Sequence, residues 1–522
     1  MGAAVPRGVW QRRLQILKDA GCNAVRISHN PGSQQFLDLC DEMGFLVQDE
    51  FFDEWDYPKD KRLNMYEQSV DEITRGYTEH FQEWAEQDLK NTVLAHRNHP
   101  SIIQWSIGNE IEWTYPRSRQ ATGFFDNLHW SGNYFWSQPP YTPQQIRQEY
   151  EKLPPLQYEI GATAQKLADW TRSLDTTRPV IANCILPSAS YETGYAQALD
   201  IIGFSYRRVM YDYGRDQYPE IPLNGTENLG QYHEWKAVME RPFVAGTFLW
   251  TGIDYLGESN GQYPRKASPA GLLDLAGFTK PSYHMMKSLW SAEPHLYIST
   301  QRLDKTAYKL DGTKVVEQEE GAWQQALWTW HEVNEYWNYE DQEMIVVEVI
   351  SNCPVVELFL DDRSMGEQRL ADFPDHIYKW AIPYKAGKLV AKGTLDGNSI
   401  ETQLATANMP VGMEITVDKT QMLANGEEVS HIIVQLIDEY QNPVRLKDIE
   451  LEFVLAGKSL HCLGIDNGSP RNTSSFQVDQ LKTHNGRALM IVQATMEPGE
   501  GSITVNGPGI ASKTITLEVA ED

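Results

Sequence analysis

The sequence predicts a multidomain chain in which an α/β domain precedes two all-β domains. Its 522 residues are too many for one ordinary domain, so we expect two to four. Up to about residue 295, helix-like segments alternate with short apolar runs. Beyond Pro294 the helical periodicity disappears, and strand-like segments follow one another. These changes predict domains at residues 1–296, 297–408 and 409–522.

The first domain alternates helices with strands from its beginning. The segment 10–20 predicts an amphipathic helix, with Leu14, Ile16 and Leu17 among charged positions, and Gly44 ends a second helix at 34–43. A third helix is expected through 77–91. Apolar runs between the helices predict seven strands, at 23–28, 45–49, 102–107, 179–182, 200–204, 221–225 and 243–250.

Seven strands separated by helices predict a (β/α)8 TIM-type barrel that lacks its first strand. That strand is expected before Trp10, but residues 1–6 are too few and too small to form it. We therefore expect either that the sequence is a fragment or that another polypeptide supplies the strand.

The remainder of the chain predicts two immunoglobulin-like β-sandwiches. Alternating runs at 343–350, 355–360, 388–392 and 399–404, with a turn at Asp361-Asp362, predict the first. The second begins near Val411, and turns at Asp466-Asn-Gly and Asn485-Gly separate its strands. Those strands are expected at 413–417, 431–437, 449–454, 488–493 and 502–505.

Composition excludes several classes of function. The net charge of −27, from 72 acidic and 45 basic residues, would repel nucleic acid and anionic lipid, so we expect neither as a partner. The five cysteines form no CxxC pair, so neither a zinc site nor a disulfide framework is indicated. The sequence contains no run of 18 apolar residues, so no membrane-spanning segment is expected. The compartment stays open, with the periplasm or the exterior favoured over the cytoplasm.

Two glutamates close apolar runs in the α/β domain. Glu110 follows Asn109 at the end of the run 101–110, and Glu227 ends the run 221–227. In a (β/α)8 barrel the C-terminal ends of the strands converge on one mouth. Cleaving a glycosidic bond with retention needs two carboxyl groups roughly 5 to 5.5 Å apart. The pattern therefore predicts a glycosidase in which Glu110 and Glu227 face each other across one sugar ring.

The segment that carries Glu110 resembles a known signature. Residues 96–110, HRNHPSIIQWSIGNE, are similar to the acid/base signature of glycoside hydrolase family 2, which includes β-galactosidases, β-glucuronidases and β-mannosidases. The segments 23–30, 36–50 and 243–255 also resemble that family, and the two C-terminal units resemble the accessory sandwiches of a β-galactosidase-like branch.

The resemblance implies a role for each of the two glutamates. Glu110 would be the general acid and then the general base, with a pKa raised by burial and by the neighbouring nucleophile. Glu227 would be the nucleophile that forms a glycosyl-enzyme ester. Asn109 would bond the 2-hydroxyl of the sugar. Glu234, the nearest alternative nucleophile, is expected to face solvent on a helix.

The resemblance also implies residues that hold the sugar and the nucleophile. Tyr206 would donate to Glu227, and Arg26 would keep Glu227 ionised by its opposite charge. The −1 subsite would be lined by His29, Asp49 and Trp250. Structural alternatives stay open for these residues, namely a buried ion pair for Arg26 and simple packing for Tyr206 and Trp250.

The segment after Glu110 is rich in aromatic residues and lacks helical or strand periodicity. Long loops at a barrel mouth are usually functional, so we hypothesise that rings such as Trp130 and Trp136 form leaving-group subsites. The alternative is that they pack the loop against the barrel or a neighbouring subunit. The residues concerned are Trp113, Tyr115, Phe124, Phe125, His129, Trp130, Tyr134, Phe135, Trp136 and Tyr141.

Taken together, these features predict a retaining exo-β-glycosidase, a β-galactosidase acting on β-linked oligosaccharides. A β-glucuronidase or other family 2 glycosidase, an inactive fragment and one chain of a split enzyme remain the alternatives. No metal is predicted, because no His follows Asp49-Glu50 at the position where a magnesium-dependent relative carries one. No cofactor is predicted either, since no Gly-rich phosphate loop is present. The chain is expected to form a homo-oligomer or to lack an N-terminal portion.

Overall fold

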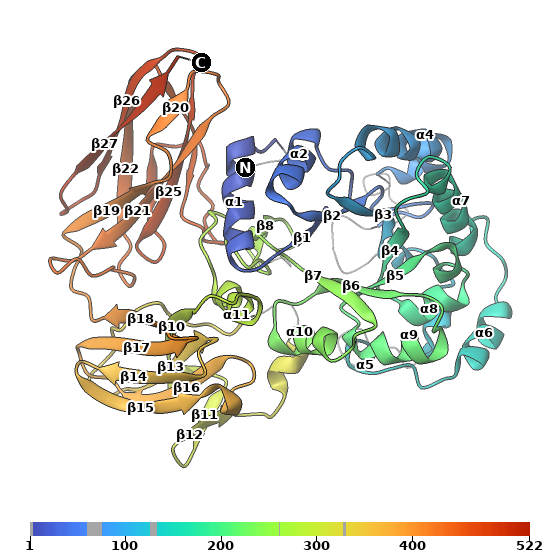
Figure 1. Cartoon of the computed structure of the whole chain (residues 1–522), viewed down its shortest axis with the longest axis horizontal. Helices are drawn as coiled ribbons and strands as arrows, with labels where there is room; N and C mark the ends of the chain where they lie inside the picture. Colours follow the sequence, from blue (N-terminus) through green and yellow to red (C-terminus); the bar gives the residue numbers. More distant parts are fainter. Residues whose placement is uncertain (1–3, 60–75, 126–132, 260–261, 327–329, 522) are drawn as a thin grey trace. The chain divides into compact units, whose positions relative to one another are not determined.

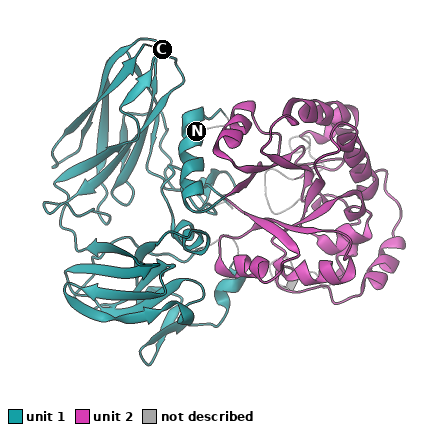
Figure 2. Cartoon of the chain, viewed as in Figure 1, with its two compact units in different colours: residues 1–22, 252–522 teal, residues 23–251 magenta. Residues whose placement is uncertain are grey.

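The computed structural model describes residues 4–59, 76–125, 133–259, 262–326 and 330–521. Two compact units emerge, one formed by residues 23–251 and the other by residues 1–22 together with 252–522 (Figure 2). Each unit has its own sheets. Within these ranges, no helix combines the length and the apolar composition needed to traverse a bilayer.

The unit 23–251 is built on a parallel sheet whose seven described strands are paired in chain order (Figure 1). The first and last strands also come into contact, so the sheet curls into a nearly closed barrel. Several strands are buried along their whole length, as expected for parallel strands with helices outside. The strands are β1 (Ala24–Arg26), β2 (Leu46–Glu50), β3 (Ile102–Asn109), β4 (Val180–Cys184), β5 (Ile201–Ser205), β6 (Leu223–Asn228) and β7 (Val244–Leu249).

Helices connect these strands, and α2 is capped at both ends. The hydroxyl of Ser33 accepts from the backbone of Phe36 at the start of α2 (Gln34–Met43), and Gly44 ends that helix with a φ of 72°. The other helices longer than five residues are α4 (Thr78–His96), α6 (Pro143–Glu151), α7 (Ile160–Arg172), α8 (Pro187–Glu192), α9 (Tyr211–Gln217) and α10 (Tyr232–Met239).

The segment after Glu110 contains more regular structure than its aromatic composition predicts. Short helical turns follow β3 at η1 (Ile111–Trp113), η2 (Gln120–Thr122) and α5 (Asn133–Trp136), and α6 comes next. A capping box between Thr142 and Gln145 starts α6. This segment is therefore a set of short helices in its described parts, and the expectation of an irregular loop is wrong there.

The other unit carries the N-terminal helix, α1 (Arg7–Asp19), a short hairpin of β8 (Tyr255–Leu256) and β9 (Ala267–Ser268), the helix α11 (Pro281–Trp290), and two β-sandwiches. In the first sandwich, one sheet pairs β10 (Leu296–Arg302), β13 (Met344–Ser351) and β16 (Ile377–Pro383). The other sheet pairs β15 (Arg363–Arg369), β14 (Val355–Leu360), β17 (Lys388–Leu395) and β18 (Asn398–Ala405). Apolar residues of both sheets share one core.

The second sandwich pairs β19 (Gly412–Val417), β21 (Val429–Ile437), β25 (Arg487–Ala494) and β23 (Leu460–Asp466) in one sheet. The other sheet contains β20 (Gln421–Leu423), β27 (Lys513–Ala520), β26 (Gly499–Asn506), β22 (Glu450–Ala456) and β24 (Gln480–Lys482). Asn485 and Gly486 both have positive φ in the turn before β25, as the sequence predicts. The predicted fold class, a TIM-type barrel followed by two β-sandwiches, is confirmed.

An apolar cluster joins α1 to the second sandwich within this unit. Val9 of α1 packs with Val429 of β21 and with Leu489 and Ile491 of β25. Ala276 and Phe278 belong to the same cluster, and Arg13 donates to the Leu275 carbonyl oxygen at 3.0 Å. The N-terminal helix and the last domain therefore share one small core.

Candidate active site

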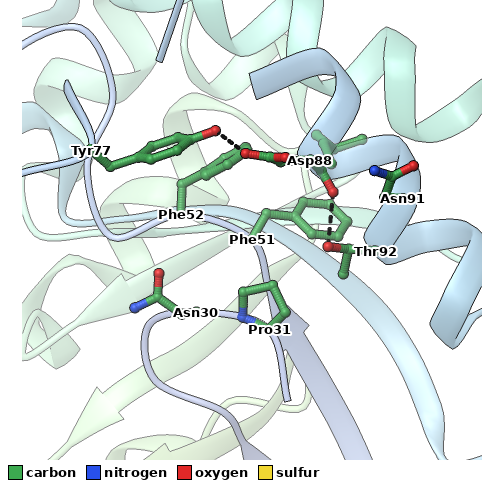
Figure 3. Close-up of a pocket in the computed structure, with 9 residues that line it drawn as sticks. Asn30, Pro31, Phe51, Phe52, Tyr77, Asp88, Asn91 and Thr92 are labelled. Carbon is green, nitrogen blue, oxygen red and sulfur yellow. Dashed lines mark hydrogen bonds between the residues drawn. The ribbon is translucent and has the colours of Figure 1, made fainter. Parts of the chain in front are cut away.

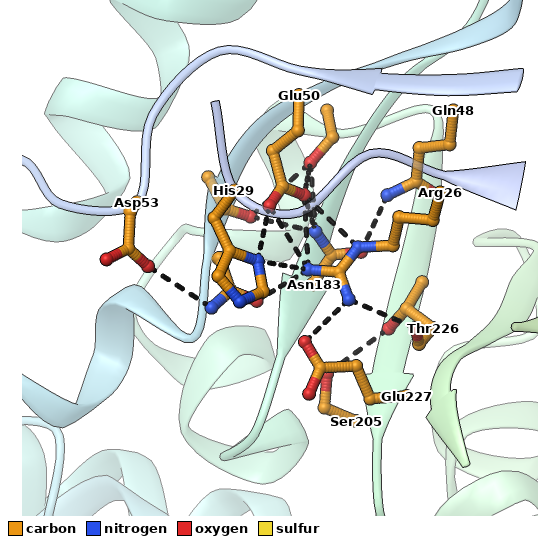
Figure 4. Close-up of polar contacts among 12 residues, drawn as sticks. Arg26, His29, Gln48, Glu50, Asp53, Asn183, Ser205, Thr226 and Glu227 are labelled. Atoms are coloured by element: carbon orange, nitrogen blue, oxygen red, sulfur yellow. Dashed lines mark hydrogen bonds and ion pairs between the residues drawn. The ribbon is translucent and has the colours of Figure 1, made fainter. Parts of the chain in front are cut away.

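Arg26, the last residue of β1, is the centre of a polar cluster at the C-terminal ends of the barrel strands (Figure 4). Its Nη1 donates to Glu227 Oε1 at 2.5 Å, and its Nη2 donates to Asn109 Oδ1 at 2.7 Å. The side chains of Arg26 and Glu227 are only 3% and 5% exposed. One guanidinium therefore brings the candidate nucleophile and the residue before the candidate acid together.

Glu50, the last residue of β2, is a second carboxylate held by the same guanidinium. Its Oε1 accepts from Arg26 at 3.1 Å, and its Oε2 accepts from the Ser106 hydroxyl at 2.7 Å and from the Asn183 amide. His29 Nδ1 lies 2.9 Å from Glu50 Oε1. Burial acts to raise the pKa of Glu50, but Arg26 and His29 outweigh it and hold that pKa below its ordinary value.

The charge of Arg26 is secured by these two carboxylates. Burial acts to lower the pKa of Arg26, but the charges of Glu50 and Glu227 raise it above its ordinary value. The result is a buried group with two anions around one cation, in which Arg26 stays protonated and Glu227 is oriented by a short charge-assisted hydrogen bond.

Amide side chains continue this cluster into the barrel. Gln48 donates to Asn183 Oδ1 at 2.8 Å, and Gln104 donates to Gln48 Oε1 at 2.7 Å. All three side chains are buried. A barrel interior is more often filled by branched apolar residues. Here Asn183 also donates to Glu50, which accepts from Arg26, so the chain of hydrogen-bonded amides helps to fix the positions of Glu50 and Arg26.

Asn109 is held at both ends of its side-chain amide. Arg26 donates to its Oδ1, and its Nδ2 donates to Asp53 Oδ1 at 3.4 Å. Lys59 Nζ donates to the backbone carbonyl of Asn109 at 2.8 Å and to Asp53 at 2.9 Å. Burial acts to raise the pKa of Asp53, but Lys59 and His29 hold it well below its ordinary value. Asn109 is thus fixed in position and orientation.

Glu110 lies directly after β3 in an unusual backbone conformation. Its φ is 46°, in the left-handed region that non-glycine residues seldom adopt. Its backbone N–H donates to the Asn183 carbonyl oxygen at 2.7 Å, and Trp113 Nε1 donates to its Oε2 at 3.2 Å. Backbone strain of this kind is often found at functional sites.

Three further predicted residues lie around Glu227 and Arg26. Tyr206 has a φ of 56°, and its backbone N–H donates to the Glu227 carbonyl oxygen at 2.5 Å. The rings of His29 and Trp250 stack with centroids 5.2 Å apart, and the backbone of Trp250 donates to Asn228 beside Glu227. Donation from the Tyr206 hydroxyl to Glu227 stays a prediction.

Asp49 is not part of this cluster, which corrects its predicted place in the subsite. Its Oδ2 lies 2.7 Å from Nδ1 of His96 in α4, and its Oδ1 accepts from the backbone of Gly32. Successive residues of a strand point to opposite faces, so Gln48 and Glu50 face Arg26 and Asp49 faces α4. Alternation implies that only one of Asp49 and Glu50 faces Arg26, but it does not say which, so the sequence alone could not identify Glu50.

Glu234 is buried in α10, so the expectation that it faces solvent is wrong. Its Oε1 accepts from Arg208 Nε at 2.7 Å, and its Oε2 accepts from the Asn228 amide at 2.8 Å. Burial raises the pKa of Glu234 above its ordinary value, although Arg208 and Asn228 act in the opposite direction. Glu234 therefore supports the residue that follows Glu227.

Half of the described residues in the aromatic set after Glu110 are buried, which agrees with the packing alternative for those residues. Tyr115, Phe124, Tyr134 and Phe135 are buried. Trp113 and Trp136 are half-buried, and Tyr141 is exposed. Trp130, with His129, lies outside the described residues.

A cavity of about 410 Å³ opens beside β1 and β2 rather than at Glu227 (Figure 3). Phe52 and Tyr77 stack on one side of it with centroids 5.6 Å apart, and the Tyr77 hydroxyl donates to Asp88 at 2.5 Å. Asn30 and Pro31, which follow His29, also line it. None of the candidate catalytic residues is among the described residues that line this cavity.

A possible metal-ligand set lies elsewhere, in α2 and after α4. Asp38, Asp41 and His99 bring one oxygen or nitrogen atom each within 4.8 Å of the others. His99 Nδ1 already lies 2.7 Å from Asp41, so the set is accounted for as an ion pair. It is separate from Glu110 and Glu227.

Comparison with known families finds glycosidase domains at both ends of the chain. Residues 1–127 match the model "Glycosyl hydrolases family 2, TIM barrel domain", and residues 413–516 match "Glycoside hydrolase family 2 C-terminal domain 5". Residues 342–401 match a "Domain of unknown function (DUF4982)".

Similar proteins cover nearly the whole chain. The beta-galactosidase BoGH2A of Bacteroides ovatus is 26% identical, over 100% of this chain and 60% of that protein. A putative beta-glucuronidase of Formosa agariphila is 24% identical, over 96% of this chain and 45% of that protein. A crystal structure of a glycosyl hydrolase family 2 member from Bacteroides cellulosilyticus has a TM-score of 0.78 at 26% identity, covering 99% of this chain and 60% of that one. The chain thus spans 60% or less of each of these proteins.

Proposed function

The chain belongs to glycoside hydrolase family 2, and we propose that it is a retaining exo-β-glycosidase that removes galactosyl units from the ends of β-linked oligosaccharides. The observation that carries the proposal is the guanidinium of Arg26, which binds Glu227 and Asn109 together at one barrel mouth. Such a cluster suits a nucleophile that attacks the anomeric carbon and an amide that binds the neighbouring 2-hydroxyl.

In the first step, Glu227 attacks the anomeric carbon while the glycosidic carbon–oxygen bond breaks. Glu110 gives its proton to the departing oxygen, so the leaving group departs as a neutral alcohol. The electron pair of the broken bond stays on that oxygen, and a glycosyl ester of Glu227 remains. Arg26 holds the Glu227 carboxylate in place for attack through a short charge-assisted hydrogen bond.

In the second step, Glu110 acts as a base. It removes a proton from water, whose oxygen attacks the anomeric carbon and displaces Glu227 as a carboxylate. Two inversions at one carbon give net retention. Asn109, fixed by Arg26 and Asp53, would bond the 2-hydroxyl and strengthen that bond as positive charge develops on the ring.

A β-glucuronidase is the second candidate, because two of the similar Formosa agariphila proteins are named putative beta-glucuronidases. The galactosidase is favoured because BoGH2A, which matches this chain over its whole length, is a beta-galactosidase. The sequence also contains no convincing Asn-x-Lys pair for holding a sugar carboxylate.

The test is hydrolysis of 4-nitrophenyl β-galactoside, β-glucuronide and β-mannoside by the purified chain, with NMR detection of the first product anomer. We expect the β-galactoside to be cleaved fastest and the β-anomer to appear first. Glu227→Gln should abolish turnover while leaving the circular dichroism spectrum unchanged. Appearance of the α-anomer, or full activity of Glu227→Gln, would contradict the mechanism. If only a longer, N-terminally extended chain is active, the fragment alternative holds.

A further inference from the structure

Arg207 is a buried cation without a carboxylate partner among the described residues. Its side chain is fully buried, and its Nε and Nη1 have no hydrogen-bond partner. Its Nη2 makes one long contact, 3.4 Å, to the Ser137 carbonyl oxygen. The guanidinium lies 3.9 Å from the centre of the Tyr134 ring. Most of its hydrogen-bonding capacity is therefore unused.

Other arginines in the same unit show how unusual this is. Arg26 is held by two carboxylates, Arg208 by Glu234 at 2.7 Å and Arg117 by Glu159 at 2.6 Å. Burying a charge without a counter-charge is costly. The cation–π contact with Tyr134 offsets only a part of that cost. Burial accordingly lowers the pKa of Arg207, with Tyr134 acting against it.

The position of Arg207 relates it to the candidate active site. It follows Tyr206, whose backbone N–H donates to Glu227, and Ser205 is paired with Glu227 in the sheet. Arg207 therefore lies just beyond the C-terminal end of β5, at the same end of the barrel as Glu110 and Glu227.

Tyr134, whose ring lies under the Arg207 guanidinium, is close enough to Glu110 and Glu112 to be affected by their charges. Its hydroxyl donates to the Ile185 carbonyl at the end of β4. Burial raises the pKa of the Tyr134 hydroxyl; Arg207 lowers it, and Glu112 and Glu110 raise it further. Because Glu110 is the proposed acid that protonates the leaving oxygen, the side of the site near Glu110 is the one from which the leaving group departs.

We propose that Arg207 binds an anionic substituent, a carboxylate or a sulfate ester, on the leaving-group part of the substrate. This inference rests on the proposed glycosidase function. The cleaved sugar would lie against Arg26, Asn109 and Glu227, and no described hydrogen bond joins any of these three residues to Arg207. An anion carried farther out, on the leaving group, would supply the missing counter-charge.

The chemistry of the guanidinium suits that ligand. Arginine presents five N–H donors in a fixed plane, which match the oxygens of carboxylates and sulfates. An anion would take up the donors on Nε and Nη1 and would replace the long contact to Ser137. The ring of Tyr134 would remain as a flat support beneath the guanidinium.

The experiment compares matched leaving groups on the sugar that the native chain cleaves best. The substrates are the 4-carboxyphenyl glycoside, its uncharged methyl ester and the 4-sulfooxyphenyl glycoside. The variants are Arg207→Met and Arg207→Lys, with Arg215→Met as a control, because Arg215 is exposed on α9. kcat/KM is measured for each pair.

We expect Arg207→Met to lower kcat/KM about tenfold or more for an anionic substrate, and less than about twofold for the ester. Arg207→Lys should keep a part of the preference, and Arg215→Met should change nothing. The carboxylate and sulfate arms identify which anion is preferred. Equal losses on charged and uncharged substrates in Arg207→Met would overturn the proposal, and so would native enzyme that favours the ester.

A second measurement separates this proposal from the glycosidase function. Sodium sulfate, compared with sodium chloride at equal ionic strength, should raise Tm of the native chain more than that of Arg207→Met, because the general stabilising effect of sulfate is common to both. If no glycoside is cleaved and this difference is present, the proposed reaction fails and the anion site stands. If sulfate raises both Tm values equally and the charged substrates show no dependence on Arg207, the anion site fails.

Discussion

Arg26 donates a 2.5 Å hydrogen bond to Glu227, although the two residues lie 201 positions apart in the chain. The same guanidinium is anchored by Glu50 on its other side. Arg26 therefore orients Glu227, the candidate nucleophile. The position of Arg26 is in turn fixed by Glu50, a second buried carboxylate. The orientation of the Glu227 carboxylate therefore depends on Arg26.

Replacing Arg26 should lower the rate by releasing the candidate nucleophile. Arg26→Met removes the donors that hold Glu227 and Asn109, so kcat/KM should fall about 10²-fold. Arg26→Lys keeps a charge but loses the fork that binds Glu227 and Asn109 together, so its rate should fall by less. An unchanged kcat/KM in both variants would mean that Arg26 acts only in packing.

Removing the proposed acid should affect substrates according to their leaving groups. Glu110→Gln should lower kcat about 10²–10⁴-fold for oligosaccharides, whose leaving oxygen needs a proton. A 2,4-dinitrophenyl glycoside needs no such help, so its first step should be nearly unaffected. Glu227→Gln is the matched comparison, because it should abolish turnover of both substrates. Equal losses on both by Glu110→Gln would argue against the acid role.

Trp136 tests the leaving-group subsites. Trp136→Ala should raise KM for oligosaccharides but not for small aryl glycosides, because only the longer substrates reach beyond the cleaved bond. Trp130→Ala is expected to do the same. Trp84→Ala, at an exposed position of α4, serves as the control. The ring of Trp136 also lies 5.9 Å from the Arg208 guanidinium, so equal effects on all substrates would indicate packing alone.

The ion pair of Arg208 and Glu234 should be costly to break from one side. Arg208→Met leaves the Glu234 carboxylate buried with less compensation, so the free energy of unfolding should fall by about 3–5 kcal/mol. The double variant, Arg208→Met with Glu234→Met, should recover a part of that loss because no charge is left behind. Urea unfolding curves measure both. If the double variant loses as much free energy of unfolding as Arg208→Met and Glu234→Met lose in sum, the two residues are not coupled.

Asp274 predicts a pH-dependent stability in the second unit. Burial raises the pKa of its carboxyl to about 7, with Arg487 acting in the opposite direction. Because this pKa exceeds the value of ~3.9 for an unfolded chain, the folded state binds the proton more tightly. The resulting stabilisation is complete below about pH 4 and is lost as the pH rises through about 7. Neighbouring charges include Asp254 and Lys280.

Thermal unfolding between pH 4 and pH 8 checks this. The Tm of the native chain should fall relative to that of Asp274→Asn as the pH rises, because Asn cannot ionise. Asp311→Asn, at an exposed strand position, is the control and should show no such change. Parallel curves for the native chain and Asp274→Asn would contradict the raised pKa.

Local sequence patterns were sufficient for the barrel but not for its side-chain partners. Apolar runs bounded by turn residues predict all seven barrel strands. The same runs placed Arg26, Asn109 and Glu227 at strand ends. The barrel order then brought these side chains together.

What could not be predicted depends on partners far away in the sequence. Glu234 reads as a polar position on a surface helix, and Arg208, 26 residues earlier, together with Asn228 supplies the donors that it needs when buried. Asp49 was placed on the wrong side of β2 because a two-residue acidic pair does not say which member faces inward. The short helix α5 buries Tyr134 and Phe135, although no helical period in the sequence marks it.

The apolar contact between Val9 and Val429 has a consequence for how the polypeptide is made. Translation must add 420 further residues after Val9 before Val429 exists, which takes about 20–80 s at 5–20 residues per second. Throughout that interval Val9 of α1 lacks the part of its native cover that Val429, Leu489 and Ile491 supply. The nascent chain is therefore a natural client for chaperones that recognise exposed aliphatic side chains, until synthesis of its final domain is well advanced.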